Sequence, residues 1–371
     1  MNVLLLILDG LSPRHVRADV MPTLSAMAEA GGWNKPGGVA VMPASTYPNH
    51  ATFVTGVTPA VHGLWSSMIP TPGWAGETAD SRQVAPLVEA WEVGPSSPTV
   101  FEVCGRGGRS TAAVLGDHHL VGAMGAAAAD RCWPVGGKFG GEVPRDALEY
   151  ADDAATAEQI ADAIGQGPDL VVAQLNGPDT AAHLYGPDSA EALEAYRYND
   201  AAIGRVREAL APRWDDWVVM VVSDHSQEAA GEEAIDLDQE IENRGISARV
   251  IRDGSAAIVT GDGGGDPRWL DDVEAVVGVE PLADDTVVVW GRPGSSFGPH
   301  RWGVPGIHGS PRTTPQVAVV SGGHGAVASL IEWVEATPPP ATAWARVTSR
   351  LLQLPAVGGI PRLPDAGSIP G

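Results

Sequence analysis

The sequence predicts an α/β fold in which buried parallel strands alternate with helices. Residues 3–8 and 217–222 are short, uninterrupted apolar runs, as expected of strands that are covered on both faces, and residues 170–175 form a further, mostly apolar run that predicts a short buried strand. The three runs are followed at once by Asp-Gly, Asn-Gly and Ser-Asp, which are typical of turns. Apolar residues recur at helical spacing over residues 155–164 and 190–210, between these predicted strands.

Local patterns predict the other elements in chain order. A helix over residues 21–31 has Pro22 near its start and Gly31 at its end. Further strands are predicted at residues 38–42, 111–115 and 316–320. Further helices are predicted at about residues 85–92, 325–336 and 341–354.

Residues 226–300 differ in composition from the segments around them, being more polar and richer in glycine. They contain short apolar stretches near residues 248–251, 256–259 and 286–290, which predict a small subdomain inserted as a cap or lid. We therefore expect a catalytic domain over residues 1–335 that includes this insertion. Residues 336–371 are expected to form a C-terminal helix and a Pro-rich tail.

Composition limits the classes of partner. The chain has 371 residues, 44% of them hydrophobic, and 23 Lys and Arg against 46 Asp and Glu, a formal charge of −23. Such an acidic chain has no electrostatic footprint for nucleic acid or for an anionic membrane. Cys104 and Cys132 are too few for a disulfide framework. The N-terminal apolar run has no basic flank and no small-residue cleavage site, so we expect a cytoplasmic protein.

The segment from Ala44 to Gly56 contains the candidate nucleophile. Pro48 suits the first turn of a helix, and Thr46 just before it suits the N-cap. There the free backbone N–H groups and the helix dipole favour an anion such as phosphate. A helix cap without further function is the alternative interpretation of a single threonine.

Six acidic and histidine side chains suggest two metal sites. Asp179 and His183 are four residues apart, so one helical turn places both on the same face. His308 would complete this set, and the adjacent pair Asp224-His225 with Asp9 and the Thr46 oxygen would form a second. A helix cap at Asp224-His225 and a loop histidine at 308 are the alternatives.

Two such metals, about 4 Å apart, activate a nucleophile and hold the oxygens of an in-line phosphoryl transfer. Thr46 would then attack phosphorus and become a phosphothreonine that water hydrolyses. His118-His119 also resembles a metal-binding pair, but the sequence around it offers no obvious completing ligand. We expect residues 116–148, which contain this pair, to be a loop or lid without a direct role.

These motifs, in this order, resemble the alkaline phosphatase superfamily, and within it most closely the type I phosphodiesterase/nucleotide pyrophosphatase branch. The residues that carry the resemblance are Asp9-Gly10, Thr46-Tyr47-Pro48-Asn49-His50, His62-Gly63, Pro178-Asp179, His183, Ser223-Asp224-His225 and Gly306-Ile307-His308-Gly309. The resemblance implies an alkaline-phosphatase-like fold, with a mixed, mostly parallel sheet between helices. It also implies a small-molecule phosphate ester as substrate and two divalent metal ions, Zn²⁺ or, alternatively, Mn²⁺.

The resemblance also implies residue roles. Asp179, His183 and His308 would bind one metal, Asp9, Asp224 and His225 the other, with Thr46 as the nucleophile bridging towards the second. The branch usually follows the Asp-His pair with Gly-Met, where this chain has Ser226-Gln227. Its phosphate-holding asparagine corresponds by position to Ser67, whose hydroxyl offers one donor instead of two.

Other activities on the same fold are distinguished by the nucleophile. A sulfatase would need Cys or Ser, and the superfamily's mutases usually use Ser with manganese, so Thr46 argues against both. A phosphate monoesterase and a phosphonoacetate-hydrolase-like enzyme would keep the same metal ligands and the same threonine. A non-enzyme alternative is an inactive homologue that binds metal or a partner protein.

Overall fold

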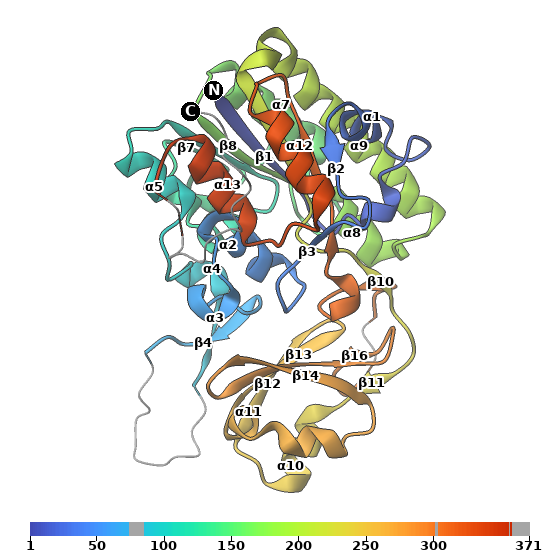
Figure 1. Ribbon diagram of the computed structural model, residues 1–371. Helices are drawn as coiled ribbons and strands as arrows, with labels where there is room; N and C mark the ends of the chain where they lie inside the picture. The colour runs from blue at the N-terminus through green and yellow to red at the C-terminus, as the bar shows by residue number, and fades with distance from the viewer. Residues whose placement is uncertain (74–84, 301–302, 356, 358–371) are drawn as a thin grey trace.

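The computed structural model describes residues 1–73, 85–300, 303–355 and 357, and its main body is built on one seven-stranded sheet (Figure 1). The strand order is β2-β19-β9-β1-β8-β6-β7. The five strands from β9 to β7 run parallel, whereas β19 pairs antiparallel with both β9 and β2. The mixed, mostly parallel sheet is therefore confirmed. The strand bounds are β1 Asn2–Leu8, β2 Gly32–Trp33, β6 Thr111–Leu115, β7 Arg131–Trp133, β8 Leu170–Leu175, β9 Trp217–Val222 and β19 Ala318–Ser321.

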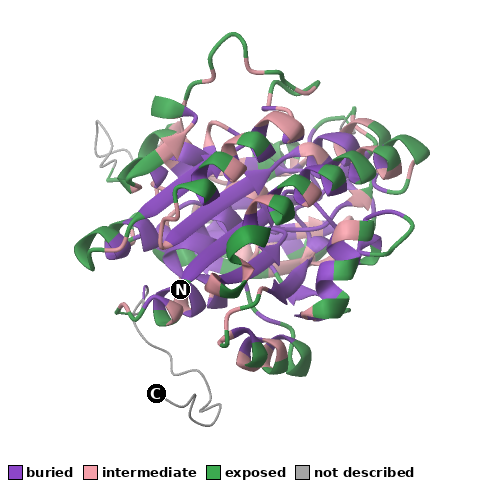
Figure 2. Cartoon of the chain, turned by 90° about the horizontal axis from the view of Figure 1, so that it is seen from above, coloured by how far each residue is buried: buried purple, intermediate pink, exposed green. Residues whose placement is uncertain are grey.

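Helices cover both faces of this sheet because its central strands are apolar on both faces. Successive residues of β1 enter two different cores: Leu5 and Ile7 belong to one, Leu4 and Leu6 to the other. Figure 2 shows the buried strands between layers of helices that are exposed on their outer sides. The first core includes residues of α2 Thr46–Thr55, α5 Val100–Arg106, α6 Leu120–Ala123, α12 Val327–Ala336 and α13 Ala343–Leu351. The second includes residues of α1 Pro22–Ala30, α7 Asp153–Gly165, α8 Gly177–Tyr185 and α9 Ala190–Leu210.

A second, smaller sheet lies within the segment expected to be the cap, and it forms the lower lobe of Figure 1. Its four antiparallel strands have the order β12-β13-β15-β14. Their bounds are β12 Ala248–Asp253, β13 Ala256–Gly261, β14 Val276–Ala283 and β15 Thr286–Gly291. The helix α10 Leu237–Arg244 packs on this sheet, and Ile235, Leu237, Val259 and Val289 belong to its own hydrophobic core. The domain boundaries at residues 226, 300 and 335 stay predictions.

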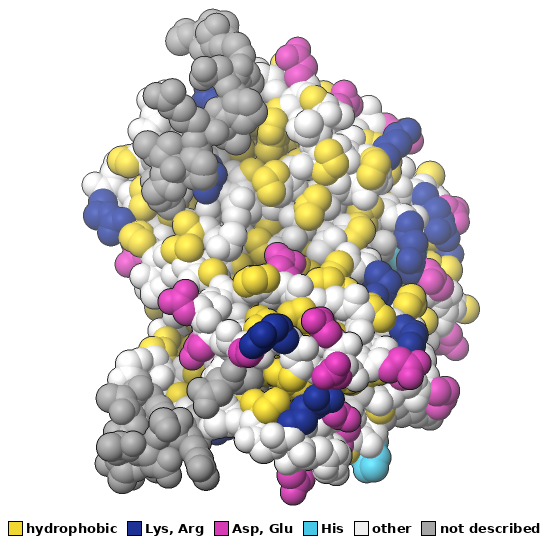
Figure 3. All heavy atoms as spheres, turned by 60° about the horizontal axis from the view of Figure 1, so that its bottom comes forward, with side chains coloured by type: hydrophobic (Ala, Val, Ile, Leu, Met, Phe, Trp, Pro, Cys, Tyr) yellow, Lys and Arg dark blue, Asp and Glu magenta, His cyan; other side chains and the backbone are white. Residues whose placement is uncertain are grey.

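The face shown in Figure 3 carries Lys and Arg side chains interspersed with Asp and Glu. This pattern fits the acidic composition and gives no continuous basic surface on that face. Among the helices that the structure describes, none combines the length and the apolarity needed to cross a bilayer. The cytoplasmic location stays a prediction.

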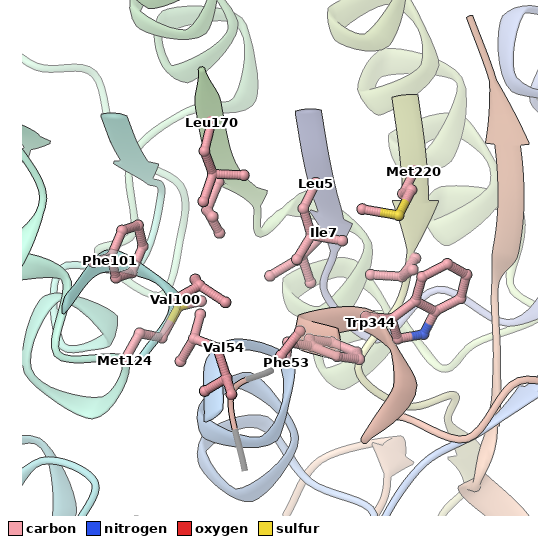
Figure 4. Packing of buried hydrophobic residues seen from close by; sticks show 14 of the residues in the cluster. Leu5, Ile7, Phe53, Val54, Val100, Phe101, Met124, Leu170, Met220 and Trp344 are labelled. Atoms are coloured by element: carbon pink, nitrogen blue, oxygen red, sulfur yellow. The ribbon is translucent and has the colours of Figure 1, made fainter. Parts of the chain in front are cut away.

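The C-terminal helix α13 packs into the first core of the main body. Trp344 is fully buried there and makes an edge-to-face contact with Trp333, with ring centroids 5.3 Å apart. Figure 4 shows Trp344 close to Phe53 of α2 and to the sheet residues Ile7 and Met220. The Pro-rich tail predicted beyond this helix falls almost wholly on residues 358–371, outside the described residues.

Two predicted elements differ from the structure. The helix expected at 85–92 is instead a short strand, β5 Leu87–Glu89, followed by a single helical turn, α4 Ala90–Val93. The strand β5 pairs with β4 Met68–Pro70, and this pairing overrides the local helical pattern. The strand expected at 38–42 is only β3 Gly38–Val39, which pairs with β18 Pro315–Gln316.

Candidate active site

The site lies where the central strands of the main sheet end. Asp9 directly follows β1, α8 begins two residues after β8, and Asp224-His225 follow β9 by one residue. Because β1 lies between β8 and β9 and is parallel to both, these three chain segments leave the same edge of the sheet side by side. The backbone N–H groups of Gly10 and His225 both donate to Asp224 Oδ1, at 3.0 Å each, and so hold this carboxylate in place.

Thr46 is the first residue of helix α2, and Ser45 occupies the N-cap position. The expectation that Thr46 is itself the N-cap is therefore wrong. The Ser45 hydroxyl does not cap the helix but donates to Asp253 Oδ2 at 2.8 Å. The Thr46 Oγ1 atom lies 3.3 Å from His225 Nε2, so the threonine oxygen reaches the Asp and His residues at the strand ends.

The first predicted ligand group comes together in the structure. The ligand atoms of Asp179, His183 and His308 all lie within 4.8 Å of one another. The Nδ1–H of His183 donates to the carbonyl oxygen of Gly306 at 2.9 Å, which leaves the Nε2 lone pair free. That Nε2 atom lies 3.4 Å from Asp179 Oδ2. Two acceptor atoms thus face each other, as ligands of a shared cation do.

The second predicted group is divided between two sets whose ligand atoms lie within 4.8 Å of one another, one of Asp9, Asp179 and His225 and one of Asp9, His50 and Asp224. The Nδ1–H of His225 donates to the carbonyl oxygen of Ser226 at 3.1 Å, which again leaves Nε2 as the free atom. This atom lies 3.1 Å from Asp224 Oδ2 and 3.8 Å from Asp9 Oδ1. The rings of His225 and His308 stack with centroids 4.0 Å apart, so the two groups adjoin. The set of Asp9, Asp179 and His225 links both groups.

Several buried atoms of these groups lack a hydrogen-bond partner. They are Asp9 Oδ1, Asp224 Oδ2, His50 Nε2 and His308 Nδ1. Leaving such atoms buried and unpaired is unfavourable, by about 1–3 kcal/mol for a neutral group and more for a charged one. Carboxylates and imidazoles that face one another in this way fit a divalent metal ion, which would supply the missing partner.

The pKa shifts of the site residues also fit a bound cation. Burial and the neighbouring Asp224 and Asp179 raise the pKa of Asp9 well above its usual value. Burial opposes the charged form of His225, but the charges of Asp224 and Asp179 and the hydrogen bonds to Asp224 and Ser226 together outweigh burial and raise its pKa. Burial, with His225 and His183 nearby, holds the pKa of His308 well below its usual value. The carboxylates therefore favour a positive charge, carried by a proton or by a metal ion.

Sequence reasoning missed three polar residues that support the site. His50 lies one helical turn after Thr46; its Nδ1–H donates to the Thr46 carbonyl at 2.9 Å, and its ring lies 3.5 Å from Asp224 Oδ2. Gln174 donates to Asp9 Oδ2 at 2.9 Å, and Gln227 donates to Asp179 Oδ1 at 2.5 Å. Gln174 had a signal, because it is the only polar residue in an otherwise apolar strand.

The smaller sheet also reaches the site, through the hairpin between β12 and β13. Asp253, at the end of β12, accepts the Ser45 hydrogen bond, and burial raises its pKa to about 6. The Ser255 N–H donates to the His308 carbonyl at 2.8 Å. At Gly254, φ is +61° and an added Cβ would lie 2.4 Å from the same carbonyl oxygen, so only glycine fits there.

Ser67 lies just before β4, and its backbone is hydrogen-bonded to the start of α4. Its carbonyl accepts a hydrogen bond from the Ala90 N–H, and its side chain is half-buried. Within the described part of the chain, no hydrogen bond joins the Ser67 side chain to Thr46 or to the six acidic and histidine residues. The preceding Ser66 is buried and faces Asp253. The phosphate-holding role of Ser67 stays a prediction.

The sequence matches the family model "Type I phosphodiesterase / nucleotide pyrophosphatase" over residues 3–290, most of the chain. The chain belongs to the type I phosphodiesterase/nucleotide pyrophosphatase family. This confirms the resemblance stated from the motifs. The venom phosphodiesterase of Macrovipera lebetinus is 25% identical to this family member over 182 residues. That match spans 47% of this chain and 19% of the venom protein.

Solved structures share the fold of this family member. Murine ectonucleotide pyrophosphatase/phosphodiesterase 5 has a TM-score of 0.69 at 17% identity, over 99% of this chain and 98% of the other. Its inactive threonine-to-alanine variant in complex with AMP has the same TM-score and identity, over 99% and 97% of the two chains. Phosphonoacetate hydrolase from Sinorhizobium meliloti 1021, in complex with phosphonoformate, has a TM-score of 0.62 at 18% identity, over 86% and 89%. These likenesses confirm the alkaline-phosphatase-like fold.

Proposed function

We propose that this chain is a metal-dependent phosphodiesterase or nucleotide pyrophosphatase that acts through a covalent phosphothreonine at Thr46. The observation that carries the proposal is the position of Thr46 Oγ1. It lies at the start of helix α2, 3.3 Å from His225 Nε2, beside two groups of buried Asp and His side chains. A hydroxyl beside a metal-binding set is what an activated nucleophile requires.

The residues at hand fit two divalent ions. Asp179, His183 and His308 would hold one, and Asp9, Asp224 and His225 the other, with Thr46 beside the second. When bound, such ions lower the pKa of a coordinated hydroxyl and neutralise the charge of a phosphoryl group. The imidazole ligands favour Zn²⁺, with Mn²⁺ as the alternative.

The chain's own residues would then perform the transfer. Thr46 Oγ attacks phosphorus, an O–P bond forms, and the bond from phosphorus to the leaving oxygen breaks. Water then cleaves the threonine–phosphorus bond and regenerates the hydroxyl. The start of α2 directs backbone N–H groups and the positive end of its dipole to the phosphate oxygens.

The proposed substrate is a small phosphodiester, including a nucleotide diester. The family description and the AMP complex of the murine relative support this class. A phosphate monoester or a phosphonate is the second candidate, supported by the fold shared with phosphonoacetate hydrolase. The same nucleophile and metal ligands serve either class.

Turnover of two chromogenic esters tests this proposal. Purified protein is assayed on bis(p-nitrophenyl) phosphate and p-nitrophenyl phosphate, before and after EDTA treatment and after Zn²⁺ or Mn²⁺ is added back. We expect faster turnover of the diester, lost with EDTA and restored by metal. Turnover that resists chelation would contradict the metal-dependent mechanism. Faster turnover of the monoester would contradict the substrate class.

A further inference from the structure

A second cluster of metal-ligating side chains lies outside the site described above. The ligand atoms of Asp117, His118 and His119 all lie within 4.8 Å of one another. The pair of histidines was expected from sequence to lack a completing ligand. The structure supplies one in the residue immediately before them, because the turn after β6 brings the Asp117 carboxylate close to the Nδ1 atoms of both rings.

In the cluster, two imidazole nitrogens face one carboxylate oxygen without a hydrogen bond to it. His119 Nδ1 lies 3.1 Å and His118 Nδ1 lies 4.0 Å from the same oxygen, Asp117 Oδ1. Both nitrogens are buried atoms without a hydrogen-bond partner, although each ring as a whole is about one-third exposed. In a tetrahedral zinc site the ligand atoms are about 3.4 Å apart, since each lies about 2.1 Å from the metal. The observed separations fall on either side of that value.

Neighbouring groups hold the three side chains in this orientation. His119 packs on Trp91 with ring centroids 4.2 Å apart, and His118 meets Phe139 edge to face at 5.5 Å. The His119 N–H donates to Asp117 Oδ1 at 2.8 Å, and the Asp117 N–H donates to Gln174 Oε1 at 3.0 Å. The same Gln174 donates to Asp9, so the cluster is tied to the main site through one side chain.

We propose that Asp117, His118 and His119 form a third metal site, which binds Zn²⁺. One carboxylate and two imidazoles are a zinc-type ligand set, and three protein ligands leave a position open for water or for an anionic oxygen. The site does not depend on the proposed reaction, since none of its three residues belongs to the two ligand groups beside Thr46.

Zinc stoichiometry tests the site. Full-length protein is dialysed against a fixed concentration of free Zn²⁺, and bound metal is measured by mass spectrometry. The wild type is compared with a variant that carries both His118→Ala and His119→Ala. The control is His300→Ala, which removes an exposed histidine from the smaller lobe. We expect the double variant to bind one zinc fewer per chain than the wild type and the control.

The difference between the proteins tests the third site, whereas the absolute number tests the two-metal centre. Three zinc ions in the wild type against two in the double variant support both the third site and the two-metal centre. One zinc ion in the wild type against none in the double variant supports the third site alone. Equal zinc content in wild type and double variant overturns the third site. If circular dichroism shows that the double variant is unfolded, the single variant His118→Gln replaces it. His118→Gln should then lower the affinity for one zinc ion by at least about tenfold. Unchanged affinity for every zinc ion overturns the site.

Discussion

In the candidate site, hydrogen bonds to the backbone leave one nitrogen of each of two histidines free to bind a metal ion. His183 and His225 both donate Nδ1–H to a backbone carbonyl, so both present a bare Nε2 to nearby carboxylate oxygens. Hydrogen bonds of this kind fix the tautomer and the ring orientation of metal-ligating histidines. Supporting residues such as Gln174 do the same for the carboxylates.

Removing the Gln174 amide should therefore weaken the metal centre. In Gln174→Met the side chain keeps its length but no longer donates to Asp9, so a buried carboxylate oxygen loses its partner. We expect metal affinity or activity to fall by about 10–100-fold, as for other supporting residues of metal sites. Zinc titration and diester turnover measure the effect. The matched control is Gln166→Met, at an exposed glutamine at the end of α7. Equal affinities of the two variants would contradict the supporting role.

At the scale of elements, the hairpin between β12 and β13 connects the smaller sheet to the nucleophile segment. Its tip binds the N-cap residue of α2 through Asp253 and the backbone of His308 through Ser255. The two elements that carry Thr46 and His308 are thus held by the same four-residue turn. The smaller sheet supports the site directly and does more than cover it.

Two glycines give a matched test of this connection. Gly254 in the hairpin tip and Gly245 after α10 have nearly the same φ, +61° and +63°. A Cβ at Gly254 would meet the His308 carbonyl oxygen at 2.4 Å, whereas a Cβ at Gly245 has no heavy atom within 4 Å. The positive φ should destabilise both alanine variants by about 1–2 kcal/mol. Only Gly254→Ala should also displace His308.

We expect Gly254→Ala to lose at least about tenfold in turnover, since a misplacement of 1 Å in a catalytic group can reduce rates by about a hundredfold. Gly245→Ala should keep wild-type turnover and show only a lower melting temperature. Thermal unfolding and the diester assay separate the two effects. Equal turnover in both variants would show that the hairpin does not position His308.

At the scale of the whole molecule, the features carried by local sequence were the predictable ones. The apolar runs at β1, β8 and β9 indicated the buried parallel strands, and Asp9, Asp179 and Asp224 lie just after the ends of these strands. The element at residues 87–93 was missed because strand pairing with β4 decides its structure. The contact from Ser45 to Asp253 spans 208 residues, and no local pattern encodes it. Asp117 was overlooked because the turn that folds it over His118 and His119 is not evident from residue types.

Buried neutral histidines should make the whole molecule sensitive to acid. Burial lowers the pKa of His62 to about 4. Its Nδ1 accepts from the Leu64 N–H at 3.2 Å, and its Nε2–H lies 3.1 Å from Thr52 Oγ1, so the neutral ring is the form that fits. The unfolded state takes up this proton near the ordinary histidine pKa of about 6.5. Stability from the neutral ring is therefore complete above that pH and is lost as the pH falls from about 6.5 towards 4.

This loss amounts to about 2 kcal/mol between pH 7 and pH 5. Urea unfolding with EDTA present, which removes any contribution of bound metal, measures it at both pH values. In His62→Gln the fall in unfolding free energy between these pH values should be smaller by that amount. The same pH dependence in both proteins would contradict the neutral, buried histidine. Burial also lowers the pKa of His15 to about 4. His15 is present in the wild type and in His62→Gln alike, so its contribution to the pH dependence cancels in the comparison.

The most direct test of the central claim compares the wild type with Thr46→Ala and Thr46→Ser, each loaded with Zn²⁺ and assayed on bis(p-nitrophenyl) phosphate. The proposed mechanism predicts that Thr46→Ala loses turnover by about a thousandfold or more while it keeps its zinc. Thr46→Ser, which retains a hydroxyl, should keep measurable turnover. Turnover of Thr46→Ala within tenfold of the wild type, with zinc bound, would contradict Thr46 as the nucleophile.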